Sequence, residues 1–388
     1  MPAVPPCLVP ITGVSRAGPA RLTGKWLAAQ LCPDRGRRNG MAMKLGVFLS
    51  HDTAIEVAQE AERLGYAIAL APEGFKSDAV SVLGALAART SRIRLASGVM
   101  QIPARSPVLT ALTAATLDAL SAGRFCLGLG VSNPDVSRGW YGVPFGRPLE
   151  RAREYVEIVR MALRGEPVRH EGRHFQLPPP GSTEAAHLRA APVPAEIPIY
   201  LAGVGPRSVS LAGEIADGWI GVFSSPARIG ESLEHIRTGR ERAGLDLDGF
   251  EILPSVPLGV GTDLTAAADL LRGYFANFIG LGGQRSSIYT ALVTRMGYGE
   301  AAGEIHARFR SGDRAAAARA VPFELIDETS LLGPAERIAR RLADFARAGV
   351  TTLGVTLLHP AAAEQLRALR VATEALHLME TTIRPATA

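Results

Sequence analysis

The chain has 388 residues, of which 47% are apolar, and a formal net charge of +5. This length suits two ordinary domains or one α/β barrel, which takes about 250 residues or more. The charge resides in residues 1–42, where six basic residues face one acid, Asp34, so that 36 basic and 36 acidic residues remain for the rest. A neutral body excludes the electrostatic pattern of a nucleic-acid-binding protein.

Residues 1–42 are rich in Pro, Gly and Arg and lack the apolar stretch of a secretory signal. We predict that they form a disordered N-terminal extension; the alternative is a real start at Met41 or Met43. No run approaches the roughly 18 apolar residues of a membrane span. Three scattered cysteines (Cys7, Cys32 and Cys126) are too few for a disulfide framework or a zinc site. The sequence therefore predicts a cytoplasmic protein with no metal, membrane or nucleic-acid partner.

From Lys44 onward, short apolar runs alternate with segments of helical periodicity. The runs are continuously apolar, as expected of parallel strands that are covered on both faces. Eight units of strand and helix predict a single (β/α)8 TIM barrel over residues 43–388, with an open doubly wound sheet as the alternative. The predicted strands are residues 44–49, 67–71, 93–99, 124–130, 197–203, 217–223, 251–261 and 351–358.

Helix signals accompany these strands. Asp78 is the predicted N-cap of a helix over 78–90, and a helix over 107–123 begins at Pro and ends at Gly. Two insertions interrupt the rhythm. Residues 166–196 are rich in Pro, His and Gly and predict an irregular segment, and residues 263–330 contain a long helical stretch over 263–320.

The fifth predicted strand leads through a Gly-rich turn into a helix. Such a turn presents unpaired backbone N–H groups and the positive end of a helix dipole to an anion. Arg207 can add a charge-assisted contact to phosphate. The alternative is an ordinary turn with a solvated Arg. The predicted phosphate site comprises Ala202, Gly203, Val204, Gly205, Pro206 and Arg207.

Four segments carry a resemblance to a known family. They are RIRLASGVMQIPARSP with LTAATLDALSAGRFCLGLGV (92–131), WYGVPFG with REYVEIVRMALRGEPV (140–168), IPIYLAGVGPRSVSLAGEIADGW (197–219) and IDETSLLGPAERIARRLADFARAGVTTLGV (326–355). In this order they resemble the luciferase-like monooxygenase superfamily. Within it, the chain looks most like the coenzyme F420-dependent branch that is related to methylenetetrahydromethanopterin reductase. The resemblance implies a (β/α)8 barrel and a homodimer.

The resemblance also implies a coenzyme site at the ends of strands 2, 3 and 4. A non-proline cis peptide is expected in Ser97-Gly98-Val99, as a bulge behind the deazaflavin ring; the alternative is a plain strand end. Glu73 matches an acid that contacts the deazaflavin edge in related enzymes, although Gly74 stands where many relatives have His. The alternative for Glu73 is a salt bridge to a neighbouring loop. The other expected ring contacts are Gly130, Val131 and Ser132.

Candidates for chemistry and substrate binding follow other strands. The candidate catalytic residues are His51 and Glu73. His51 could act as a general acid, or be a surface loop residue. Phe48 and the pair Trp140–Tyr141 could line a substrate pocket; the alternative for the pair is to anchor its loop. Asn133 stands where sugar-phosphate dehydrogenases of this branch carry a carboxylate, which favours a reductase.

The resemblance therefore implies hydride transfer from reduced F420 to an unsaturated small molecule, such as an enone or imine. The first alternative is an FMN-dependent monooxygenase that activates O₂. The second is a non-catalytic protein that only binds the cofactor.

Overall fold

The computed structural model describes residues 43–188, 196–282 and 287–383. The chain divides into two units, residues 1–37 and 38–388, and every described residue belongs to the second. The prediction of a disordered extension over 1–42 therefore lies outside the described residues.

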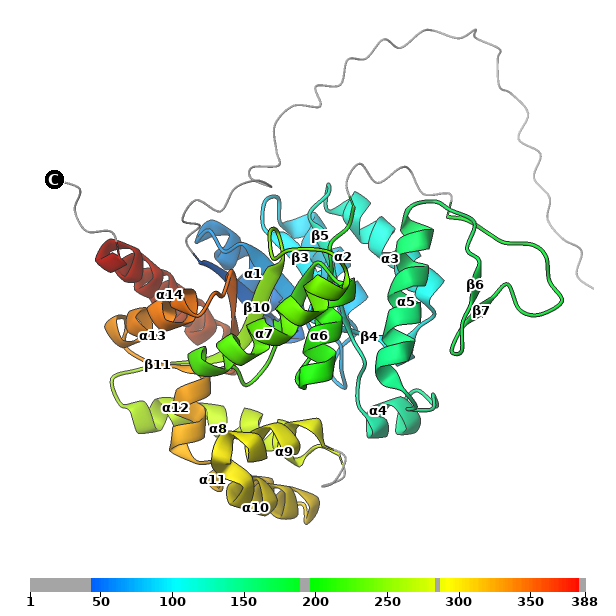
Figure 1. The fold of residues 1–388 in the computed structure, drawn as a ribbon. Helices are drawn as coiled ribbons and strands as arrows, with labels where there is room; N and C mark the ends of the chain where they lie inside the picture. The colour runs from blue at the N-terminus through cyan, green and yellow to red at the C-terminus, as the bar shows by residue number, and fades with distance from the viewer. Residues whose placement is uncertain (1–42, 189–195, 283–286, 384–388) are drawn as a thin grey trace, which may run out of the picture. The chain divides into compact units, whose positions relative to one another are not determined.

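Eight parallel strands form a closed barrel by their pairing. Figure 1 shows helices packed around these strands. Each strand pairs with the next, and β12 pairs back with β1 in a register that begins at Lys44↔Thr352. This closure confirms the predicted (β/α)8 barrel and excludes the open sheet. The barrel strands are β1 (Lys44–Phe48), β2 (Ile68–Ala71), β3 (Arg94–Ser97), β5 (Phe125–Gly130), β8 (Ile199–Ala202), β9 (Gly218–Gly221), β10 (Glu251–Val260) and β12 (Thr352–Leu357).

Helices connect the strands, and their ends follow the expected signals. The Asp78 side chain accepts a hydrogen bond from Ser81 N at 2.9 Å, which confirms the predicted N-cap. Ser106 caps the helix that begins at Pro107. The helices that alternate with the barrel strands are α1 (Ala54–Arg63), α2 (Ala79–Arg89), α3 (Pro107–Leu120), α5 (Pro148–Leu163), α6 (Pro206–Ile215), α7 (Pro226–Arg242), α13 (Ala335–Arg347) and α14 (Ala362–Ile383).

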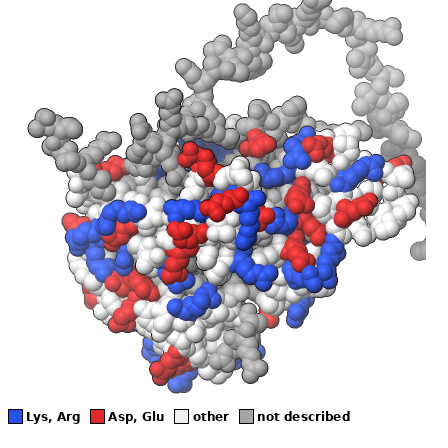
Figure 2. Space-filling view, viewed as in Figure 1, with Lys and Arg blue, Asp and Glu red and all other residues white. Residues whose placement is uncertain are grey.

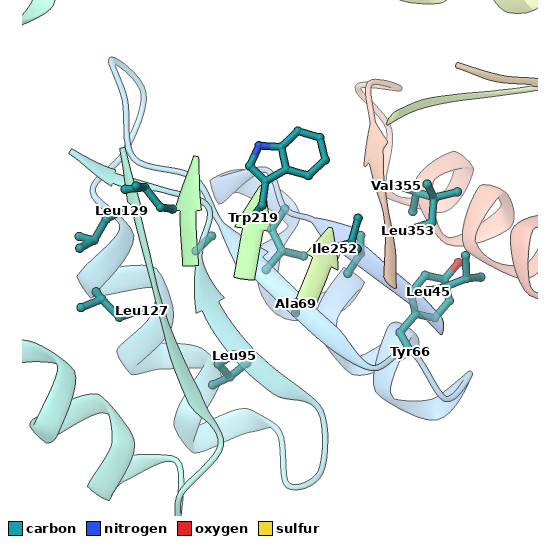
Figure 3. Packing of buried hydrophobic residues seen from close by; sticks show 14 of the residues in the cluster. Leu45, Tyr66, Ala69, Leu95, Leu127, Leu129, Trp219, Ile252, Leu353 and Val355 are labelled. Carbon is teal, nitrogen blue, oxygen red and sulfur yellow. The ribbon is translucent and has the colours of Figure 1, made fainter. Parts of the chain in front are cut away.

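Both faces of the barrel strands are buried, because successive side chains point alternately to the helices and to the interior. Leu45, Leu127 and Leu353 belong to the large cluster shared with the helices (Figure 3). A second, smaller cluster alternates with it along the same strands and fills the barrel interior. Its buried members are Ile68, Leu70, Ala96, Cys126, Tyr200, Ile220 and Leu253.

Polar side chains occupy the amino-terminal end of the barrel interior. Arg94 donates to Tyr200 Oη at 2.9 Å and to Glu251 Oε2 at 3.1 Å. The hydroxyls of Thr351 and Thr352 donate to Glu251 Oε1 at 2.6 and 2.7 Å. Burial alone would raise the pKa of Glu251, but Arg94 and the two hydroxyls outweigh burial and lower it. This network satisfies the buried charges and leaves the opposite end of the barrel for a ligand.

The described residues of the first insertion are largely irregular, as predicted, whereas the second insertion is more divided than the sequence indicates. Residues 166–196 include a small antiparallel hairpin, β6 (His170–Glu171) and β7 (Gln176–Leu177). The described part of the predicted helical stretch over 263–320 is mostly helical, as expected, but it is divided into several helices, and Gly297 and Gly312 adopt positive φ at two of the breaks. The segment forms α8 (Leu264–Gly280), α9 (Ile288–Val293), η3 (Thr294–Tyr298), α10 (Gly299–Arg310) and α11 (Arg314–Arg319), followed by α12 (Phe323–Thr329) and β11 (Leu331–Gly333).

The surface in view carries no large region of one charge. Figure 2 shows Lys and Arg side chains interspersed with Asp and Glu. None of the helices in the described residues has the length and apolarity that a membrane crossing needs.

Candidate functional site

The carboxyl ends of the eight parallel strands form one rim, here called the barrel mouth, where (β/α)8 enzymes place their chemistry. Phe48, Val99 and Ala202 come from three different strand ends, and all three pack as partly buried side chains on the interior cluster. They therefore form the upper layer of the barrel interior. The structure brings together these three residues, which the sequence analysis had assigned to the substrate and the coenzyme.

A backbone bulge lies beside this layer. The Gly98–Val99 peptide is cis, as the resemblance implied, and it separates β3 from the short β4 (Met100–Gln101). Ser97 Oγ donates to Gly128 O at 2.8 Å and accepts from Gly128 N at 2.9 Å. A Cβ at Gly128 would lie 2.0 Å from Ser97 O, and one at Gly130 would lie 2.6 Å from Val99 Cγ2. The glycines of β5 therefore allow the bulge to approach this strand closely.

Polar side chains connect the strand ends around the bulge. Glu73 accepts from Arg105 Nη2 at 2.6 Å and from Gln101 N at 3.0 Å, and its side chain is only 4% exposed. Gln101 Nε2 donates to Glu73 O at 3.2 Å, and Ser132 Oγ donates to Gln101 Oε1 at 2.6 Å. Burial raises the pKa of the nearby Tyr141, and the negative charge of Glu73 adds to this shift. The salt bridge considered for Glu73 is present, and both of its carboxylate oxygens are occupied.

The loop after β8 retains part of its predicted anion-binding capacity. Ser208 Oγ accepts from Val204 N at 3.2 Å and from Gly205 N at 3.1 Å, so these two amides are already used. Pro206 has no N–H. Within the described residues, the backbone N–H groups of Arg207 and Ser208 have no hydrogen-bond acceptor. Two amides at the start of α6 are therefore free to bind an anion.

The Arg207 side chain lies beside a groove outside the barrel rather than over the interior cluster. This groove of about 440 Å³ runs between α5, α6 and α7, and Pro206 also lines it. The sequence placed Arg207 at the start of a helix but contained no signal for the direction of its side chain. The remaining lining residues are Leu149, Glu150, Arg153, Ser210, Leu211, Glu214, His235, Thr238 and Arg242.

Other predicted residues lie on loops that follow β1 and β5. His51 is exposed in η1 (His51–Thr53), and its Nε2 lies 2.8 Å from Asp52 Oδ1. Trp140 follows α4 (Pro134–Gly139) and contacts Phe75 edge-to-face, with ring centroids 5.0 Å apart. Val131 packs on the core shared with the helices rather than on the interior cluster. Asn133 caps α4 by accepting from the Asp135 and Val136 amides.

Three residues of this region were missed by the sequence analysis. Arg105 pairs with Glu73 across 32 positions of sequence, and Gln101 connects the loops after β2 and β5. Phe75 contacts Trp140. Only Phe75, an aromatic residue in a predicted strand-to-helix loop, gave a signal that could have been used.

The chain resembles proteins of known family and structure. Residues 32–352 match the family described as luciferase-like monooxygenase. A Mycobacterium tuberculosis protein named "Putative coenzyme F420-dependent oxidoreductase" is 36% identical over 342 residues, which cover 84% of this chain and 98% of that protein. The 5,10-methylenetetrahydromethanopterin reductase of Archaeoglobus fulgidus is 30% identical over 271 residues, covering 70% of this chain and 79% of the reductase.

Solved structures agree with the fold. The coenzyme F420 dependent tetrahydromethanopterin reductase of Methanopyrus kandleri superposes with a TM-score of 0.73 at 23% identity, covering 85% of this chain and 97% of that one. An F420-dependent secondary alcohol dehydrogenase in complex with an F420-acetone adduct gives a TM-score of 0.70 at 21% identity, covering 87% and 99%. At these identities the structures support the barrel alone. The family match and the 36% identical relative together show that the chain belongs to the luciferase-like monooxygenase family.

Proposed function

We propose that this chain is a coenzyme F420-dependent oxidoreductase that reduces an unsaturated small molecule, such as an enone or imine, by hydride transfer. The observation that carries the proposal is its 36% identity, over 98% of the relative's length, to a protein named for that coenzyme. The similarity to a methylenetetrahydromethanopterin reductase favours the direction of reduction.

The barrel mouth fits a flat ring system. Phe48, Val99 and Ala202 form the upper layer of the barrel interior, and Gly130 lets the Val99 side chain lie close to β5. We propose that a ring packs on the apolar layer that Val99 and Ala202 form at the barrel mouth. We assign the ring side of the site to Ser97, Gly98, Val99, Gly130, Val131 and Ser132.

The loop over residues 203–207 would bind the phosphate of the coenzyme. The free amides of Arg207 and Ser208 and the positive end of the α6 dipole favour an anion at this place. Arg207 can reach an anion that extends from the loop toward the outer groove.

When bound in its reduced state, the coenzyme supplies a hydride. The double bond of an enone then gains hydride at the carbon β to the carbonyl and a proton at the α carbon. We assign this proton to His51, which is exposed beside the end of β1, or to water. Glu73 is poorly placed to donate, because its two oxygens accept from Arg105 and Gln101. We therefore assign it a positioning role.

The test is anaerobic mixing of the protein with reduced coenzyme F420 and an enone or imine panel, followed by the absorbance of the oxidised deazaflavin. We expect turnover with F420, and tighter calorimetric binding of F420 than of FMN. Tighter binding of FMN, with oxygen-dependent turnover, would reverse the assignment in favour of a flavin monooxygenase. Binding of F420 without turnover on any substrate of the panel would favour a non-catalytic carrier.

The Arg207→Ala variant tests the phosphate site. Loss of one charge-assisted hydrogen bond should weaken F420 binding roughly ten- to a hundredfold. Arg237→Ala is the matched control, because Arg237 lies on α7 outside the lining of the groove and pairs with Glu234. Equal affinities in wild type and Arg207→Ala would show that the side chain does not contact the coenzyme.

A further inference from the structure

Phe75 and Trp140 are large aromatic residues that remain mostly in solvent although they contact each other. Phe75 is 58% exposed and Trp140 is 60% exposed. Their rings meet at 5.0 Å with an interplanar angle of 84°, the edge-to-face arrangement that aromatic pairs prefer. The pair therefore has a defined geometry and still offers a large apolar area.

The strand order determines where this pair lies. Phe75 follows β2, Trp140 follows β5, and β3 lies between these two strands in the barrel. Because the two loops touch through their aromatic rings, the contact has to span the carboxyl end of β3. That end carries the Gly98–Val99 bulge, which the proposed function assigns to the coenzyme ring.

The polar groups around this bulge are already paired. The Glu73 carboxylate binds Arg105 and Gln101, and the Gln101 side-chain amide binds Glu73 O and Ser132 Oγ. Tyr141 is different, because its hydroxyl has no hydrogen-bond partner among the described residues. A substrate above the bulge would thus contact the rings of Phe75 and Trp140 and the free hydroxyl of Tyr141.

We infer that Phe75 and Trp140 form the specificity surface of the enzyme, and that its substrate is an apolar carbonyl compound whose hydrocarbon part packs on the two rings. Tyr141 donates a hydrogen bond to the carbonyl oxygen. The inference rests on the proposed function and narrows its substrate class. Polar substrates such as sugar phosphates are disfavoured, since the polar groups around the bulge already bind one another and the exposed surface is aromatic.

The experiment uses the full chain, reduced coenzyme F420 and straight-chain methyl enones whose tails lengthen from methyl to pentyl. Burial of each methylene on the aromatic pair should raise kcat/KM roughly fourfold in the wild type. The dependence on tail length should fall below about twofold per methylene in Phe75→Ala and Trp140→Ala. Phe75→Leu should keep most of the dependence of kcat/KM on tail length, because its side chain remains large and apolar.

Two further variants separate the roles. Tyr141→Phe should lower kcat/KM by a similar factor for every tail length, because it removes a contact to the shared carbonyl. Leu245→Ala is the control, because Leu245 is 51% exposed but precedes β10, at the opposite end of the barrel. Unchanged tail-length dependence in both alanine variants, with unaltered F420 affinity, would overturn the inference.

A second measurement does not depend on turnover. Saturated methyl ketones with the same tails are titrated without coenzyme, and the quenching of Trp140 fluorescence is followed, with Trp140→Phe as the blank. We expect the dissociation constant to fall as the tail lengthens, and this trend to weaken in Phe75→Ala. If the trend appears but no enone oxidises reduced F420, the apolar surface stands and the proposed reaction is wrong. If no trend appears in an active enzyme, the apolar surface is wrong.

Discussion

At the scale of single residues, the bulge and β5 fit together only because Gly128 lacks a side chain. A methyl group at this position would meet backbone atoms of Ser97, which cannot rotate away as a side-chain end could. Gly130 is less constrained, because the atom that it would meet belongs to the Val99 side chain. An added side chain is therefore tolerated less well at Gly128 than at Gly130.

We predict that Gly128→Ala lowers the free energy of unfolding by roughly 1–3 kcal/mol or more, the usual cost of overpacking a close contact. Gly230→Ala is the control, because Gly230 is exposed in α7 and no atom lies within 4 Å of an added Cβ. Alanine there should raise the free energy of unfolding by about 0.5–1 kcal/mol through helix propensity. Urea unfolding of both variants checks the pair. An unchanged midpoint for Gly128→Ala would mean that β3 and β5 can separate without cost.

The sequence predicted many residues of the barrel mouth but few of their partners. Gly130 and Val99 could be placed because each is the last residue of an apolar run, and all such runs end at the same rim. The Arg105–Glu73 pair could not be predicted, because the two residues lie 32 positions apart and either could have faced solvent. The free amides of Arg207 and Ser208 were only partly foreseen, since the Ser208 hydroxyl takes two of the neighbouring donors.

At the scale of elements, a carboxylate of α1 holds the segment that enters β3. Glu62 Oε2 accepts backbone hydrogen bonds from Ser91, Arg92 and Ile93 at 2.9, 2.7 and 2.9 Å. Burial alone would raise the pKa of Glu62, but these donors outweigh burial and lower it. A carboxyl whose pKa is lowered in the folded state stabilises the fold above its unfolded pKa, and this contribution is lost as the pH falls through the folded pKa.

We predict that Glu62→Gln lowers the free energy of unfolding by about 1–3 kcal/mol near neutral pH, the scale of hydrogen bonds to a charged group. The difference from wild type should shrink as the pH falls below about 4.3, the ordinary value for Glu. Glu56→Gln, on an exposed position of the same helix, serves as control. Denaturant unfolding at several pH values provides the measurement. A difference that stays constant down to acid pH would show that Glu62 acts through packing rather than through its charge.

Elements were predicted well where strand and helix periodicity differ and poorly where helices follow one another. The eight strand runs were found, because a short apolar run with both faces buried is distinctive next to amphipathic helices. The segment from α8 to α11 was predicted as one stretch, because helical periodicity continues across its breaks. Gly297 and Gly312 lie at two of these breaks. An isolated glycine is tolerated within a helix, so neither glycine was enough to predict that a helix ends there.

At the scale of the whole molecule, α3 exposes an unusual apolar face. Leu109, Leu112 and Leu120 are 51%, 46% and 60% exposed. The only charged residue of the helix is Asp118, and it is buried. An exposed apolar face without charges is typical of a surface that binds another protein. We propose that a second copy of this chain covers it, as the resemblance to dimeric relatives implied.

We predict that Leu112→Glu converts a dimer into a monomer, because association would bury the new charge without a partner. Leu245→Glu is the matched control, with a leucine of 51% exposure on a loop away from α3. Light scattering coupled to size-exclusion chromatography reports the mass of each variant. A wild type that is monomeric at micromolar concentration would contradict the proposed dimer. A Leu112→Glu variant that is still a dimer would show that the dimer interface does not include this face of α3.

The pairing of β1 with β12 also affects the chain while it is being synthesised. Lys44 pairs with Thr352, which is 308 positions later. At about 5–20 residues per second, a ribosome needs roughly 15–60 s to supply that partner. Until then, one edge of β1 keeps its backbone donors and acceptors unpaired, and such edges recruit other strands. The growing chain, rather than the finished barrel, is therefore the form of this protein that most needs protection from aggregation.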